Sequence, residues 1–141
     1  TPYRLGTIYE LLAGQEVSSD QRGELLSEAA EFYEEAIRAD PYAASVYLEL
    51  ANLRLLQNRA DDARTLLQRA ITVEPNLLPA RVRYAQLAVK DREFAIARKE
   101  YEAIIQIRKK YEGLVLTTLE RQFLDVDLKP LERALSLEGK P

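Results

Sequence analysis

The chain has 141 residues, a formal net charge of −3, and no His, Cys, Met or Trp. Without imidazole or thiol groups it contains no Ser-His-Asp triad, no thiol nucleophile, no disulfide and no nitrogen or sulfur ligand for zinc. Hydrophobic residues make up 47% and charged residues 30% of the chain, which is typical of a folded globular protein and not of a disordered one.

Charge is distributed unevenly along the chain. Residues 1–40 carry a net charge of −6, and residues 76–111 carry +5. The basic segment is expected to attract an acidic segment of a partner, or alternatively to be a solvated face of amphipathic helices. The acidic total, with a pI of about 5.2, argues against nucleic-acid binding, which requires a continuous basic track.

Apolar residues recur every three or four positions over most of the chain, which predicts helices and not strands. Polar segments interrupt this pattern at Asp40-Pro41, Asn58-Arg59-Ala60-Asp61, Glu74-Pro75-Asn76 and Lys90-Asp91. Because a carboxylate accepts hydrogen bonds from the first free amides of a helix, Asp61 or Asp62 and Asp91 are expected N-caps.

The two helix-ending prolines, Pro41 and Pro75, lie 34 residues apart. The same register aligns Ala29, Tyr33 and Ala36 with Ala63, Leu67 and Ala70, and with Ala97, Tyr101 and Ile104. Upstream it aligns residues 9–14 with residues 47–52 and 81–86. Each unit is therefore predicted to be a pair of antiparallel helices. Small residues on both helices allow the close approach, namely Ala13, Ala51 and Ala85 on the first helices and Ala29, Ala63 and Ala97 on the second.

These residues resemble the tetratricopeptide repeat family, whose unit carries large, apolar and small positions on its first helix and small, aromatic and small positions before a proline on its second. The resemblance covers roughly residues 5–111 and implies an all-α fold, a right-handed superhelical solenoid of antiparallel helix pairs in a single domain. It divides the chain into repeat 1 (1–43), repeat 2 (44–77), repeat 3 (78–111) and C-terminal capping helices (112–141).

Two segments depart from the regular repeat. Repeat 1 has about four additional residues, one helical turn, within residues 15–26. There Ser18-Ser19-Asp20 is expected to be a loop that ends in an N-cap, so that the insertion gives either a larger turn or a longer second helix. After repeat 3, Thr117 with Glu120 forms a capping-box pattern, and Asp127 is expected to cap a last helix with Pro130 in its first turn. This end region is either a cap for the exposed apolar face or a degenerate fourth repeat.

The first helices of such a solenoid line its concave groove. The resemblance places ten candidate peptide-binding residues there, which are Glu10, Leu48, Glu49, Asn52, Leu55, Val82, Arg83, Gln86, Val89 and Lys90. Asn52 and Gln86 are equivalent, and an amide at that position either binds the backbone of an extended peptide or is an ordinary solvated residue. The apolar members of the set either contact a ligand or pack against neighbouring helices.

Some members of the family clamp the terminal carboxylate of a peptide with two basic and two amide side chains. Arg83 occupies one basic position, but Pro79 occupies the other position of that helix. Glu49 stands where the preceding helix would carry an amide, and the first unit has Glu10 and Gly14 in place of a basic residue and an amide. A chaperone-tail clamp is therefore not expected, whereas an acidic segment attracted by the basic side chains of repeat 3 is.

The predicted function is that of a non-catalytic protein–protein interaction module or scaffold, which needs no cofactor or metal and binds a peptide or protein segment in its groove. The alternatives are a self-associating spacer and the soluble segment of a larger bacterial envelope protein. The second alternative is based on residues 108–113 and 119–127, which resemble the ends of tetratricopeptide segments attached to bacterial membrane proteins that polymerise or ligate surface polysaccharide. With no apolar run of about 20 residues, direct membrane insertion is not expected. A cytoplasmic or periplasmic location is expected if the chain is bacterial.

Overall fold

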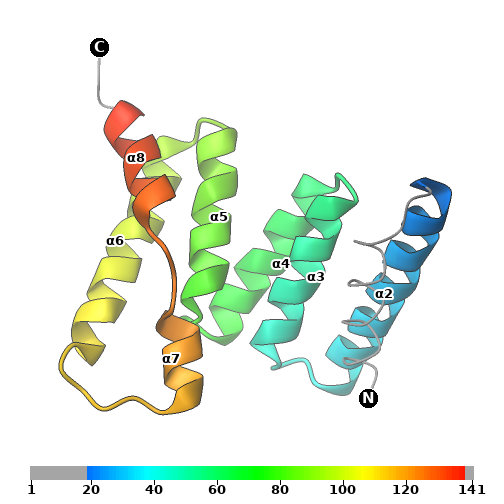
Figure 1. Cartoon of the computed structure of the whole chain (residues 1–141), viewed down its shortest axis with the longest axis horizontal. Coiled ribbons are helices and arrows are strands. Elements are labelled where there is room, and N and C mark those ends of the chain that lie inside the picture. The colour runs from blue at the N-terminus through cyan, green and yellow to red at the C-terminus, as the bar shows by residue number, and fades with distance from the viewer. Residues whose placement is uncertain (1–18, 139–141) are drawn as a thin grey trace. The chain divides into compact units, whose positions relative to one another are not determined.

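The computed structural model describes residues 19–138, which contain seven α-helices and no strand. The all-α prediction is therefore confirmed. The chain divides into two compact units, Thr1–Val73 and Glu74–Pro141, and each is described by itself (Figure 1). The predicted first helix of repeat 1, which includes Glu10, lies outside the described residues. No helix within 19–138 combines the length and the apolar character that crossing a membrane requires.

Unit 1 contains α2 (Ser19–Ala39), α3 (Ala44–Leu56) and α4 (Ala60–Val73). Helix α3 packs against both of the other helices. The α2–α3 core consists of Leu26, Ala29, Ala30 and Tyr33 with Val46, Leu50 and Leu53. Among the small positions predicted from the repeat, Ala29, Ala51, Ala63 and Ala70 are fully buried. The close helix approach follows from these alanines, because any larger side chain would separate the backbones.

The insertion in repeat 1 lengthens a helix. Helix α2 has 21 residues, against 14 in α4. Ser19 and Asp20 already lie within α2, so the expected loop at these two residues is wrong. Asp20 lies in the first turn, where its carboxylate interacts favourably with the positive end of the helix dipole.

Unit 2 contains α5 (Leu78–Lys90), α6 (Phe94–Tyr111), α7 (Thr118–Leu124) and α8 (Lys129–Glu138). Helix α8 packs on both α5 and α6. The cluster that joins them consists of Ala85 and Ala88 on α5, Ala97 on α6, and Leu131 and Leu135 on α8. Helix α8 thus covers an apolar face of the α5–α6 pair.

The turns inside the two helix pairs have the same backbone geometry. Asn58 after α3 and Arg92 after α5 adopt positive φ angles of 60° and 62°. In each turn the following residue donates its N–H to the carbonyl five residues earlier, from Arg59 to Arg54 and from Glu93 to Ala88, both at 2.8 Å. This Schellman-type ending satisfies carbonyls that have no partner within the helix. The 34-residue period therefore extends to the backbone conformation of the turns.

The predicted caps differ in their outcome. Asp91 is the C-cap of α5, and Asp61 and Asp62 lie inside the first turn of α4, so the prediction of N-caps there is wrong. The Schellman turns place the new helix start one or two residues away from these carboxylates. Thr117 does cap α7, because its hydroxyl oxygen accepts from the Glu120 N–H at 3.1 Å. Asp127 caps α8 through a 3.1 Å bond from the Lys129 N–H.

Candidate functional site

Helix α5 and the connection between α7 and α8 enclose a hollow of about 200 Å³ on unit 2. We call it the α5 hollow. Its lining residues are Pro79, Val82, Arg83, Gln86, Val126 and Asp127. Four of the six come from the first helix of repeat 3, which the sequence predicted to line the groove. The other two come from the end region and were not predicted, because nothing in the 34-residue pattern indicates where the chain returns after α7.

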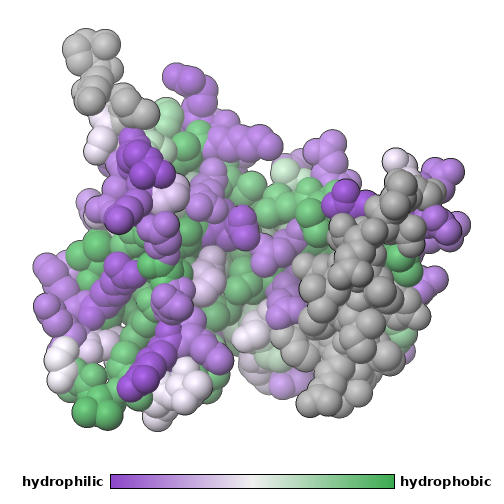
Figure 2. Space-filling model, viewed as in Figure 1, coloured by the Kyte–Doolittle hydropathy of each residue, from purple (hydrophilic) through white to green (hydrophobic). Residues whose placement is uncertain are grey.

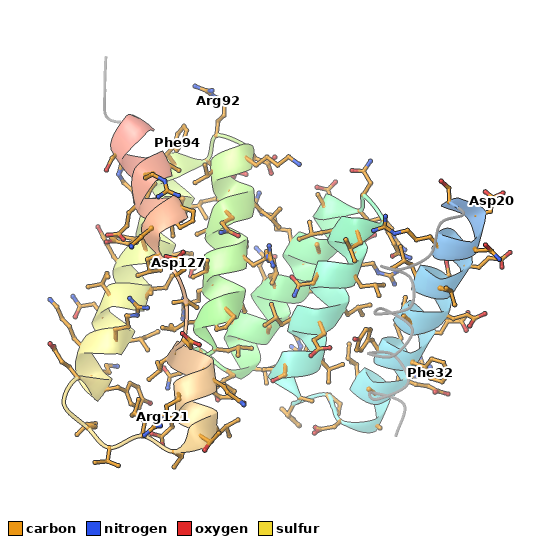
Figure 3. The ribbon with its side chains drawn as sticks, in the orientation of Figure 1. Asp20, Phe32, Arg92, Phe94, Arg121 and Asp127 are labelled. Carbon is orange, nitrogen blue, oxygen red and sulfur yellow. The ribbon has the colours of Figure 1, made fainter. Side chains whose placement is uncertain are left out.

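The far wall of the α5 hollow is held by contacts on both sides of Val126. Leu128 is buried in a cluster with Ile104 and Ile107 of α6. The Arg108 guanidinium donates a 2.6 Å hydrogen bond to the Val126 carbonyl oxygen. Asp127, labelled in Figure 3 at the start of α8, accepts the capping bond from the next helix. The wall is therefore an ordered part of the unit, and a ligand in the hollow contacts both α5 and this segment.

The α5 hollow combines a cation, an amide and apolar surface. Arg83 is exposed and forms no ion pair with any residue of the described part of the chain. Gln86, one helical turn further along, is half-buried. Val82 is buried at the base, and the Asp127 carboxylate stands on the opposite wall. Because both charge signs line the hollow, a ligand with an acidic group is expected to place it towards Arg83 and away from Asp127.

In unit 1 the predicted groove residues lie on α3. Leu48, Glu49, Asn52 and Leu55 are all half-buried. Glu49 accepts a 2.9 Å hydrogen bond from the Tyr33 hydroxyl of α2, so its carboxylate is already engaged between helices. The Oδ1 atom of Asn52 is buried and has no hydrogen-bond partner within residues 19–138. A buried acceptor without a partner costs about 1–3 kcal/mol, so it is a feature that needs an explanation.

The apolar groove residues of unit 2 are covered by the end of the chain. Val82 belongs to the cluster that contains Leu128, and Val89 packs against the cluster that contains Leu131. Of the two readings left open by the sequence, packing against neighbouring helices is the one found for both valines. Lys90 is exposed at the last position of α5. The open part of the site on α5 is therefore narrower than predicted and centres on Arg83 and Gln86.

A larger hollow of about 480 Å³ lies in unit 1 and was not predicted. Its lining residues are Glu34, Ile37, Arg38, Tyr47, Leu50, Arg54, Arg59, Asp62, Thr65 and Leu66. Two ion pairs cross its surface, Arg54 with Glu34 and Arg59 with Asp62. Arg54 lies on the first helix α3, and its partner Glu34 lies on the second helix α2. Because this hollow depends on contacts between helices, the first-helix pattern alone gives no signal for it.

Within residues 19–138 no three carboxylates converge as metal ligands. The hydrogen bond that Tyr101 donates to Glu132 raises the pKa of Tyr101 above its ordinary value of 10.0, and burial adds to this. That phenol remains protonated at neutral pH, so the shift provides no general base there.

Known proteins resemble the chain in part of its sequence and in its fold. Residues 25–77 match the tetratricopeptide repeat model. Terminal uridylyltransferase 1 of Leishmania tarentolae is 43% identical over 51 residues, which are 36% of this chain and 5% of that protein. The chain thus corresponds to a small fraction of that relative's length, and the match is local.

Among solved structures, the first tetratricopeptide repeat domain of Spaghetti (RPAP3), bound to an HSP90 peptide SRMEEVD, is similar with a TM-score of 0.58 and 14% sequence identity. The alignment covers 95% of this chain and 98% of that one, and it shows a common fold. Residues 25–77 thus match the tetratricopeptide repeat family, and the chain shares the fold of a solved tetratricopeptide repeat domain, with fully buried alanines at the 34-residue spacing of its helix pairs.

Proposed function

We propose that the chain is a non-catalytic interaction module that binds an extended peptide or protein segment on the first helices of its repeats. The observation that carries this proposal is the α5 hollow, where Arg83, Gln86 and Val82 lie on one helix and face an ordered wall. An extended segment presents both side chains and backbone amides. In this hollow Arg83 and Val82 can contact ligand side chains, and the Gln86 amide can hydrogen-bond to the ligand backbone.

The amide positions on the two units support the same function. Gln86 follows Asn52 by one repeat of 34 residues, and each is on the first helix of its pair. A backbone N–H of a bound peptide would give the buried Asn52 Oδ1 the donor that it lacks within residues 19–138. The unpaired acceptor is then a cost of the unbound protein that ligand binding removes.

The chemistry of the ligand follows from charge. Residues 76–111 carry +5, and Arg83 is the exposed cation in the α5 hollow. An acidic segment is therefore the preferred ligand, because a guanidinium forms strong charge-assisted hydrogen bonds with carboxylates. The similar domain of Spaghetti (RPAP3) is bound to a peptide, which supports the same class of ligand for this chain. Pro79 and Glu49 replace groups of a carboxylate clamp, so SRMEEVD itself is expected to bind weakly here.

The test is selection of peptides from a random library on the full chain, followed by fluorescence anisotropy at low salt. We expect enriched sequences to be acidic, and Arg83→Glu to weaken their binding at least about tenfold. Arg69→Glu is the matched control, because Arg69 is an exposed arginine on the second helix α4. Equal affinities of the Arg83→Glu variant and the unchanged protein would refute the role of the α5 hollow, and the peptide SRMEEVD serves as the weak reference.

A further inference from the structure

The connection between α6 and α7, together with the first turn of α7, exposes a group of apolar side chains. Leu114 is 60% exposed, Val115 is 97% exposed and Leu119 is 59% exposed. These three residues, called here the apolar tip, lie in or beside the uncharged stretch 113–119. Figure 2 shows hydrophobic surface at the lower edge of unit 2, where Figure 1 places this connection. Exposed apolar groups gathered in one place indicate an interaction surface more strongly than the same groups scattered.

Ordered helix ends hold the apolar tip outward. Gly113 adopts a φ of 78°, and the Leu114 N–H donates a 3.2 Å hydrogen bond to the Tyr111 carbonyl, so α6 stops directly before the tip. The Tyr111 hydroxyl in turn accepts a 3.0 Å bond from the Asn76 side chain. On the other side Thr117 caps α7. The exposure of the tip is therefore built into the backbone, and a bound surface would meet a preformed element.

Basic side chains surround the base of the apolar tip. Lys109 and Lys110 are exposed in the last turn of α6, and neither forms an ion pair with any residue of the described range. Arg121 is exposed on α7 (Figure 3). Residues 108–121 hold four basic and two acidic side chains, a net charge of +2 in a chain whose total is −3. The local charge is thus opposite in sign to that of an anionic surface.

We propose that the apolar tip docks unit 2 on an anionic membrane surface. Val115 projects almost completely from the protein, and a bilayer accepts a projecting apolar side chain without a matching pocket. Lysines beside such a group attract acidic lipid headgroups. The apolar tip supplies the insertion into the interface, and Lys109 and Lys110 supply the attraction. This surface is separate from the α5 hollow, so it places the interaction module at a membrane while leaving its ligand site open.

Sedimentation with lipid vesicles tests the proposal. The full chain is mixed with vesicles of phosphatidylcholine alone or of phosphatidylcholine with phosphatidylglycerol. We expect binding to the mixed vesicles that weakens with salt, because the attraction is screened within about 10 Å at 0.1 M ionic strength. The double variants Leu114→Asp with Val115→Asp, and Lys109→Glu with Lys110→Glu, should each lower the partition coefficient at least about tenfold.

The controls separate the membrane from other occupants of the surface. Tyr42→Asp changes an exposed apolar residue of unit 1, 79% exposed, and should leave vesicle binding unchanged. Val115→Ser alone is a milder change that keeps the test valid if the double aspartate variant does not fold. Equal binding of the tip variants and the Tyr42→Asp protein overturns the proposal. So does concentration-dependent self-association that the tip variants abolish in the absence of vesicle binding, because the surface would then join two copies of the chain.

Discussion

Replacing Asn52 by leucine should make the protein more stable and its ligand binding weaker. The Oδ1 atom of Asn52 is buried without a partner in the described residues, and an unsatisfied acceptor costs about 1–3 kcal/mol. Leucine has nearly the same shape and no polar atom. Because the whole side chain is half-buried, we take the lower end of this range and expect the free energy of unfolding to rise by about 1 kcal/mol.

Urea denaturation and thermal melting measure this change. A gain of about 1 kcal/mol corresponds to an increase in Tm of about 3 °C for a chain of this size. The same variant should bind a selected peptide about tenfold more weakly, since it cannot accept from the peptide backbone. Gln106→Leu, which changes an exposed amide on α6, is the control and should do neither. A lower stability of the Asn52→Leu variant would refute the assignment of an unsatisfied acceptor, and unchanged affinity would refute its role in binding.

Three further changes test the packing and the turns. Arg92→Gly should raise stability by about 0.5–1 kcal/mol in urea denaturation, because glycine adopts the positive φ of 62° without steric cost. Glu100→Gln should lower stability by about 2 kcal/mol in the same assay, since the largely buried Arg81 guanidinium, 2.8 Å away, loses its charged partner. The raised pKa of Tyr101 contributes stability that is complete below pH 10 and is lost as the pH rises through the folded-state pKa. Tyr101→Phe, which cannot bond Glu132, should therefore lose less stability than the unchanged protein in alkaline denaturation.

Each of these three changes has a control that isolates its cause. Arg92→Ala keeps the strained backbone and should give no gain. Glu102→Gln alters an exposed carboxylate of the same helix and should change stability by less than about 0.5 kcal/mol. Tyr42→Phe removes an exposed phenol and should leave the alkaline transition unchanged. If a control variant changed stability as much as its test variant, the named contact would not be the cause of the effect.

The helix pairs were predictable because close packing of two helices requires small residues at fixed positions, and these positions recur in the sequence. Ala51, Ala63, Ala85 and Ala97 are fully buried, as their 34-residue spacing indicated. Thr117 also caps the helix that its pattern predicted, since a capping box depends on residues that are close in sequence. Such features depend on neighbours within one helix or one pair, and the sequence contains that information directly.

The candidate site was less predictable because it depends on contacts between distant segments. Val126 and Asp127 line the α5 hollow because the next residue, Leu128, packs against the C-terminal half of α6. The engagement of Glu49 by Tyr33 joins residues 16 positions apart in sequence. Asp91 failed as a predicted N-cap for a different reason, since a positive φ at the next residue moves the helix start. Helical periodicity alone contains none of these three pieces of information.

The central claim is that the first helices of the repeats bind an extended acidic segment. Titration of the isotope-labelled full chain with a selected peptide, followed by amide chemical shifts in NMR spectra, tests it most directly. We predict that the largest shifts occur at Asn52 on α3, at Arg83 and Gln86 on α5, and at Val126 in the facing wall. Shifts confined to the second helices α4 and α6, with the signals of these four residues unchanged at saturation, would contradict the claim.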